Sequence, residues 1–146
     1  MFHETSLRVR YAETDKMGIV HHSNHIIWWE MARTALLRDI GLPYSELEAR
    51  GVACPVIEIH CRYRHPAHFE DELVVRTTIM EVSPVKIRFA YEIINPRTGT
   101  VVATGESLHA FTDMVTGKPT RLNKSHASVW QTLLSGGKAY FMESQG

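Results

Sequence analysis

Residues 24–40, NHIIWWEMARTALLRDI, have the pattern of one long helix, and the rest of the chain must cover it. Gly41 follows, where glycine commonly ends a helix. Trp28 and Trp29 are adjacent and therefore point about 100° apart. One flat helix–sheet contact cannot bury both, so we expect a sheet curled around the helix or a subunit interface. The helix carries one wide apolar stripe at helical spacing, formed by Ile27, Trp28, Met31, Ala32, Ala35, Leu36 and Ile40.

Beyond this helix the periodicity changes from helical to that of strands. Pro43 opens a second, shorter helix that Gly51 ends. Alternation within residues 86–93 predicts a strand with Ile87, Phe89, Tyr91 and Ile93 on one face. The turn at residues 95–99 indicates an antiparallel pair. Strands are predicted for residues 6–11, 52–63, 72–82, 86–93 and 100–112.

The whole arrangement predicts an α+β domain over residues 1–146, a sheet with its helix on one face. The C-terminal tail, residues 123–146, has a weak helical pattern up to Leu134, after which Gly136 and Gly137 predict a frayed end. Cys54 and Cys61 stand an odd number of positions apart in one predicted strand. Their side chains should face opposite ways, so no disulfide is expected.

Composition excludes several classes of function. The 146 residues contain 16 basic and 16 acidic side chains, so the formal net charge is zero. No nucleic-acid partner or anionic membrane surface is expected, and zero charge near neutral pH weakly favours self-association. The N-terminus lacks the pattern of a signal peptide, and no apolar run reaches the ~18 residues that cross a bilayer. We therefore expect a cytoplasmic protein without an integral membrane segment.

The candidate site lies in residues 11–30, YAETDKMGIVHHSNHIIWWE. Asp15 stands in a loop before the helix, Gly18 marks a turn, and His21 and His22 fall where the helix should begin. A carboxylate, a glycine turn and a helix N-terminus can together hold a carbonyl at an electropositive helix end and attack it. Asp15 also has a simpler interpretation, since Asp before glycine commonly caps a turn.

Two motifs resemble those of a known family. Residues 11–24, YAETDKMGIVHHSN, followed by Trp29, Glu30 and Arg33, resemble the signature of the 4-hydroxybenzoyl-CoA thioesterase family, in its bacterial acyl-CoA thioesterase branch. Residues 63–73, YRHPAHFEDEL, are similar to that family's second recurring stretch. The resemblance covers residues 7–122, most of the chain.

The resemblance implies a hotdog fold, in which a curved antiparallel sheet of about five strands wraps a long central helix. It implies hydrolysis of an acyl-CoA thioester to a free acid and coenzyme A, without a cofactor, in lipid metabolism. Acyl carrier protein is an alternative carrier of the acyl group. Such proteins pair through their sheets, with sites at the dimer interface, so a homodimer or a homotetramer built as a dimer of dimers is implied.

The resemblance also assigns roles to residues. Asp15 matches the catalytic aspartate, and His22 matches the residue whose backbone N–H polarises the carbonyl and whose side chain is implicated in catalysis. The carboxylate would attack the thioester directly or activate a water, and the sequence does not separate these routes. This chain has His21 and His25 where relatives commonly have tyrosine, which places the acyl preference in question. The candidate substrate-binding residues are Gly18, Val20, Lys86 and Arg88.

Gly18 is a candidate because its conformational freedom lets the loop approach the substrate. Lys86 and Arg88 are candidates for a different reason. Lys86 and Arg88 follow the turn at residues 83–84, where basic side chains of the family meet the nucleotide of coenzyme A. The polar outer face of a strand explains them equally well. Glu30 and Arg33, one helical turn apart, are most simply an ion pair.

Three other interpretations of these residues are open. His21 and His25 stand one helical turn apart and invite a zinc site with Asp15, but no cysteine or glutamate completes a known spacing, so no metal is expected. A hotdog hydratase of enoyl thioesters needs an aspartate–asparagine–histidine arrangement not found here. A non-catalytic binding module for acyl-CoA or acyl carrier protein is the alternative from another class. The histidines His60, His65, His68 and His109 are predicted to be structural.

Overall fold

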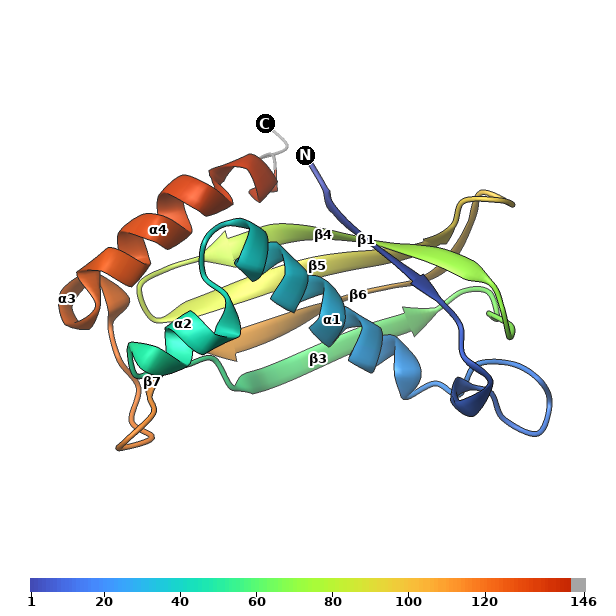
Figure 1. Cartoon of the computed structure of the whole chain (residues 1–146), viewed down its shortest axis with the longest axis horizontal. Helices are drawn as coiled ribbons and strands as arrows, with labels where there is room; N and C mark the ends of the chain where they lie inside the picture. The colour runs from blue at the N-terminus through green and yellow to red at the C-terminus, as the bar shows by residue number, and fades with distance from the viewer. Residues whose placement is uncertain (143–146) are drawn as a thin grey trace.

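The helix predicted over residues 24–40 is α1 (Asn24–Asp39), which crosses the face of a five-stranded antiparallel sheet (Figure 1). The structure is a computed structural model and describes residues 1–142. The strand order is β1-β4-β5-β6-β3, and every neighbouring pair is antiparallel. This confirms the predicted α+β hotdog architecture. The strands are β1 (His3–Arg8), β3 (Val56–Tyr63), β4 (Glu72–Val82), β5 (Lys86–Asn95) and β6 (Thr100–Ala110).

The centre of the sheet follows the predicted alternation. Along β5, every second side chain is buried, beginning with Ile87 and including Phe89 and Tyr91. The intervening side chains, such as Arg88 and Glu92, are half-buried on the outer face. Alternate faces of a strand therefore separate the core from the solvent-facing side of the sheet.

Strand ends were predicted less well than strand centres. The first strand is β1, not residues 6–11, because its register pairs His3–Arg8 with β4. Residues 52–63 divide into β2 (Val52–Ala53) and β3, since proline at position 55 lacks the N–H that a strand ladder needs. Residues 100–112 likewise divide into β6 and β7 (Thr112–Asp113), and β7 pairs with β2.

The predicted pair of cysteines needs a correction. Cys54 lies between β2 and β3, and only Cys61 lies within β3, so the two do not share a strand. Both are free thiols.

Both tryptophans of α1 are buried within one chain. Trp28 is 1% exposed and Trp29 is 0% exposed. The ring of Trp29 stacks on Tyr91 of β5 with a centroid distance of 4.9 Å. Of the two expected explanations, the sheet curled around the helix is therefore sufficient, and no subunit interface is needed to bury them.

The end of the described chain adds further helices. The tail was predicted to lose its helix after Leu134, but α4 (Ala127–Gly137) extends beyond this residue. A Cβ on Gly136 would lie 2.6 Å from the carbonyl oxygen of Ile40, so glycine here allows α4 to pack closely against the end of α1. Residues 143–146 of the predicted tail lie outside the described residues. The remaining helices are α2 (Tyr44–Ala49), α3 (Leu122–Ser125) and α4 (Ala127–Gly137), with 3₁₀ turns at Tyr11–Glu13 and Lys138–Tyr140.

Figure 1 shows which elements lie at each end of the molecule. The loop between β1 and α1 lies at the right, beside the start of the helix, while α2, α3 and α4 gather at the left. None of the helices within residues 1–142 combines the length and apolar character that crossing a membrane requires.

Gly105 of β6 lies where β3 and α1 leave no room for a side chain. A Cβ there would collide with the backbone carbonyl of His60 and with the ring of Trp29. We expect Gly105→Ala to reduce the free energy of unfolding by about 1–3 kcal/mol, the usual cost of overpacking a core. Urea denaturation measures this loss, and Thr104→Ala on the outer face should lose less than about 1 kcal/mol. Equal losses in the two variants would contradict the packing argument.

Candidate active site

Asp15 lies at the tip of a short hairpin between β1 and α1. A bridge between Thr14 and Val20 closes the hairpin, and the Asp15 N–H donates to the carbonyl of Ile19 over 2.8 Å. The N–H of Val20 donates to Ala67, which fastens the hairpin to the segment before β4. The hairpin is thus held on both sides, and its tip presents Asp15 as an exposed carboxylate.

One oxygen of this carboxylate is used by the loop and the other is free. Asp15 Oδ1 accepts the N–H of Met17 over 2.8 Å, as in an Asx turn. Within residues 1–142, Oδ2 accepts no hydrogen bond. Gly18 closes the same turn with φ of 79°, a conformation that side chains rarely adopt. The capping role of Asp15 and a chemical role are therefore compatible, because they use different oxygens.

Glu13, which was not predicted as a site residue, ties this loop to the core. Its carboxylate is buried and accepts the indole N–H of Trp28 over 2.7 Å and the backbone N–H of Arg10 over 2.8 Å. Burial alone would raise the pKa of Glu13, but these hydrogen bonds hold it below its usual value. Its carbonyl accepts from the N–H of His21 and from the side chain of Asn24. Glu13 therefore fixes the Asp15 hairpin relative to the start of α1.

The start of α1 is built around His22. The carbonyl of His22 accepts the hydroxyl of Tyr63 over 2.6 Å and faces Nδ1 of His25 at 3.2 Å. Burial, with a smaller effect from Cys61, raises the pKa of Tyr63 to about 12, so this hydroxyl keeps its proton and donates. In the part of the chain that the structure describes, the backbone N–H of His22 has no acceptor. A free N–H at the positive end of a helix is suited to bind a carbonyl oxygen that gains negative charge.

The neighbouring histidines have other partners. Nδ1 of His21 lies 2.8 Å from the hydroxyl of Ser23 at the first turn of α1. Burial lowers the pKa of His25, which therefore is neutral and donates Nδ1–H to His22. Among residues 1–142, no group of three His, Cys, Asp or Glu side chains is placed to hold a metal ion.

Several of these groups surround one cavity of about 360 Å³. Of the predicted site residues, Asp15, His22 and Val20 line it, whereas Gly18 supports the turn without lining it. Tyr63 and Arg64 begin the second motif but were not predicted individually as site residues. Their side of the cavity is formed by the end of β3 and the segment after it, namely Tyr63, Arg64, His65, Pro66 and Ala67.

Lys86 and Arg88 are not brought to this cavity within one chain. Ile93 of β5 is level with Tyr63 across β6, and Lys86 lies seven positions away, so roughly 23 Å of strand separate the two. Both basic side chains lie on the outer face and form ion pairs with Glu81 at 3.2 and 3.4 Å. Their role toward coenzyme A stays a prediction.

The fold and the site together define a class. A curled antiparallel sheet that wraps one long helix is the hotdog fold. The loop carboxylate and the free N–H at the helix start are groups suited to attack on a bound carbonyl. The model of the thioesterase-like superfamily matches residues 9–129, and the chain belongs to that superfamily. It is an enzyme, a thioester hydrolase of the hotdog fold.

Individual relatives agree with this membership. The chain is 40% identical over 126 residues to a putative acyl-CoA thioesterase, YneP, of Bacillus subtilis, covering 86% of this chain and 90% of the relative. It is 32% identical over 119 residues to the acyl-CoA thioester hydrolase YbgC of Escherichia coli, covering 82% and 88%. A DHNA-CoA thioesterase from Staphylococcus aureus has a similar structure, with a TM-score of 0.86, 28% identity and coverage of 92% and 89%.

Proposed function

We propose that this protein hydrolyses acyl-CoA thioesters to free acids and coenzyme A, with Asp15 as the reacting carboxylate and the His22 N–H as the donor to the carbonyl oxygen. The observation that carries this proposal is that Asp15 and His22 line one cavity at the start of α1. Relatives that are named acyl-CoA thioesterases support the choice of substrate.

The chemistry starts with the thioester carbonyl oxygen near the N–H of His22. Attack on the carbonyl carbon moves negative charge onto this oxygen, where the donor and the helix N-terminus stabilise it without reorganisation. In the nucleophilic route, Oδ2 of Asp15 forms a bond to the carbon, the C–S bond breaks, and coenzyme A leaves as the thiolate. Water then hydrolyses the mixed anhydride. In the general-base route, Asp15 takes a proton from the attacking water, and the same C–S bond breaks.

The test is release of free thiol by purified protein from acetyl-CoA, octanoyl-CoA and benzoyl-CoA. Catalytic turnover on at least one ester supports hydrolysis. Binding of these esters without turnover would instead identify a binding module, and the proposal would be rejected. Consumption of a crotonyl-CoA double bond without thiol release would identify a hydratase.

Removing the imidazole of His22 should matter less than removing Asp15. His22→Ala keeps the backbone N–H, so we expect kcat to stay within about tenfold of wild type. The measurement is steady-state thiol release, with the exposed His68→Ala as the matched control. A loss from His22→Ala as large as that from Asp15→Asn would show that the imidazole itself takes part in the chemistry.

We also propose that two copies pair through β3. This strand is at the edge of the sheet, and no strand within residues 1–142 pairs with its outer side. It exposes the apolar side chains Val56, Ile57 and Tyr63, and a long apolar edge is usually covered. Because Tyr63 lines the Asp15 cavity, a second copy at this edge would also shape the site.

Sedimentation should therefore give twice the chain mass of 16.7 kDa for the wild type. Ile57→Lys places a charge at the edge of β3 and should shift the protein toward the monomer, with weaker activity. Val115→Lys is the matched control, because Val115 is 91% exposed and lies in the loop after β7 rather than on β3. A monomeric wild type, or a dimer unchanged by Ile57→Lys, would contradict pairing through this strand.

A further inference from the structure

The N–H of His22, the proposed donor to the thioester oxygen, belongs to the peptide that joins His21 to His22. A trans peptide is planar, and its C=O and N–H bonds point in opposite directions. The groups that hold the carbonyl of His21 therefore also set the direction of the His22 N–H. Within the described chain this N–H has no acceptor, so the hydrogen bonds that hold the peptide are on its carbonyl side.

Asn24, the first residue of α1, holds that carbonyl with two hydrogen bonds. The oxygen of His21 accepts the backbone N–H of Asn24 over 3.0 Å and the side-chain Nδ2 of Asn24 over 3.2 Å. A carbonyl oxygen has two lone pairs, and both are then used. Any residue except proline could make the backbone bond, whereas the second bond requires a side chain that donates.

The same Nδ2 atom also ties the Asp15 hairpin to this peptide. It donates to the carbonyl of Glu13 over 3.0 Å, so one NH₂ group bridges two backbone carbonyls. Carbonyl oxygens accept and cannot donate, which fixes the amide with its NH₂ group toward them. The side chain of Asn24 therefore joins the segment just before Asp15 to the peptide that carries the donor.

These contacts affect the polarity of the His22 N–H as well as its direction. A hydrogen bond to the C=O of a peptide polarises its N–H, because hydrogen bonds in a chain strengthen one another. The peptide also lies at the positive end of α1. An N–H that is aimed and polarised before the reaction stabilises an oxyanion without reorganisation.

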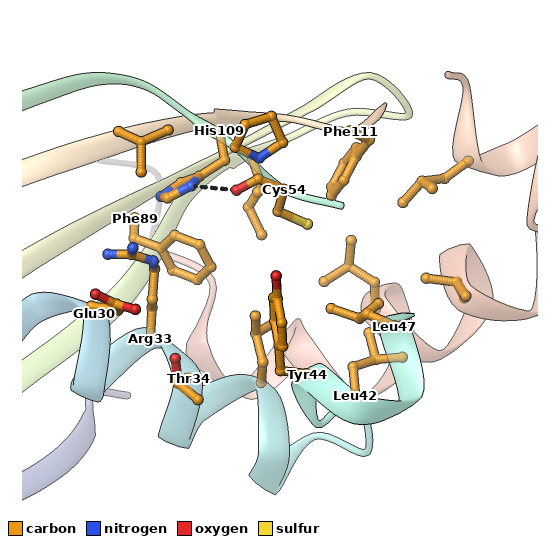
Figure 2. Close-up of a pocket in the computed structure, with 17 residues that line it drawn as sticks. Glu30, Arg33, Thr34, Leu42, Tyr44, Leu47, Cys54, Phe89, His109 and Phe111 are labelled. Atoms are coloured by element: carbon orange, nitrogen blue, oxygen red, sulfur yellow. Dashed lines mark hydrogen bonds between the residues drawn. The ribbon is translucent and has the colours of Figure 1, made fainter. Parts of the chain in front are cut away.

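Polar side chains further along α1 face a different cavity. This cavity, of about 460 Å³, is lined by Glu30, Arg33 and Thr34 and shares no lining residue with the Asp15 cavity. Figure 2 shows Glu30 and Arg33 at one side of it. The ion pair predicted between them is not formed, since no contact within 4 Å joins their charged groups in the described chain. Among residues 1–142, Asn24 is the one side chain that donates to the carbonyl of His21.

We propose that Asn24 is a positioning residue, whose side-chain amide aims and polarises the His22 N–H beside Asp15. This inference rests on the proposed thioester hydrolysis. A purely structural Asn24 would only stabilise the start of α1. Its loss would then lower the free energy of unfolding and leave the kcat of the folded enzyme unchanged.

The kinetics of Asn24→Ala separate the two roles. We expect kcat for thiol release to fall about 10- to 100-fold, less than the roughly 100- to 1,000-fold loss from removing an oxyanion donor outright. KM should stay within about threefold of wild type, because the bond to the oxyanion is made only in the transition state. Urea denaturation establishes that the variant is folded under the assay conditions. Asn123→Ala, which replaces an exposed asparagine of α3, is the matched control and should keep full kcat.

Asn24→Asp is the second variant, in case alanine prevents the start of α1 from forming. A carboxylate has the shape of the amide and is favourable at a helix N-terminus, yet it cannot donate to either carbonyl. The helix should therefore form, and kcat should fall at least as much as in Asn24→Ala.

Infrared spectroscopy of a bound ester tests the donor without turnover. Benzoyl-CoA with an isotopic label at the carbonyl carbon is bound to Asp15→Asn, which lacks the reacting carboxylate. Donation from the His22 N–H should shift the carbonyl band to a lower wavenumber than in the free ester. This shift should shrink when Asn24→Ala is added and persist when Asn123→Ala is added.

The outcomes separate this inference from the proposed function. Unchanged kcat in the folded Asn24 variants, or a carbonyl band shifted equally with and without the Asn24 amide, would overturn the positioning role and leave hydrolysis standing. A rise in KM with kcat unchanged would overturn it as well, because Asn24 would then act in binding alone. A wild type that releases no thiol, but whose carbonyl shift depends on Asn24, would support the positioning of the N–H and reject hydrolysis.

Discussion

Replacing Asp15 with asparagine should lower kcat/KM for thiol release by at least about 100-fold, the usual contribution of a nucleophile or general base. The amide keeps an oxygen in place of Oδ1, so the hydrogen bond from the Met17 N–H and the hairpin should persist. What is lost is the negative charge and the free oxygen Oδ2. The effect should therefore be on kcat, with thermal stability close to wild type.

The chain offers a matched control for this variant. Asp113 accepts the N–H groups of Val115 and Thr116 in a turn of the same kind, away from the Asp15 cavity. Asp113→Asn should keep full activity. The assay is run with EDTA, and wild-type turnover that persists in EDTA would argue against a zinc-dependent route. Asp15→Asn with activity within a few-fold of wild type would reject Asp15 as the reacting group.

Glu13→Gln should cost about 2–5 kcal/mol in the free energy of unfolding, because a buried hydrogen-bonded carboxylate is replaced by a group that cannot serve both donors. The glutamine oxygen can accept from Trp28 or from Arg10, and its NH₂ group then faces the other donor. Since Glu13 also holds the Asp15 hairpin against α1, we expect kcat to fall as well. Urea denaturation and thiol release measure the two effects.

A double-mutant cycle with Trp28→Phe isolates the central hydrogen bond. Phenylalanine removes the indole donor, so Glu13→Gln should cost less in that background than in wild type. A coupling energy of about 0.5–3 kcal/mol is expected for groups in direct contact. Strict additivity of the two losses would contradict a hydrogen bond between Trp28 and Glu13.

The lowered pKa of Glu13 also predicts a direction for pH dependence. A carboxyl whose pKa is lower in the folded chain contributes stability above its unfolded pKa, and this contribution disappears as the pH falls through the folded pKa. Stability of the wild type should therefore decrease below about pH 4.5, more steeply than that of Glu13→Gln. Identical acid profiles of the two proteins would contradict a depressed pKa.

Local patterns in the sequence were enough to predict the long helix and the long strands. The predicted helix over residues 24–40 and the observed α1 differ by one residue, because one apolar stripe and a following glycine depend only on neighbours in the chain. β4 has the predicted ends, and β5 has the predicted alternation. Asp15, His22 and Val20 were named from a motif and meet in one cavity, because all three belong to the same hairpin and helix start.

Predictions failed where distant segments decide the outcome. Gly136 was predicted to lie in a frayed end, but the close approach of Ile40 gives it a packing role inside α4. Lys86 was predicted to bind the substrate because it follows a turn. Within one chain, however, most of the length of β5 separates it from the Asp15 cavity.

The sequence by itself determined the class of fold, the loop carboxylate and the position of the helix start, since these follow from periodicity and from residues adjacent in the chain. Only the tertiary structure revealed that Glu13 accepts a hydrogen bond from Trp28 and that Nη1 of Arg33 is buried without a hydrogen-bond partner among residues 1–142. The physical reason is that the environment of a buried polar group is set by the segments packed around it. Trp28 is 15 positions from Glu13, and the cavity that Arg33 lines is also formed by residues of α2, β5 and β6, so sequence spacing contains no record of these contacts.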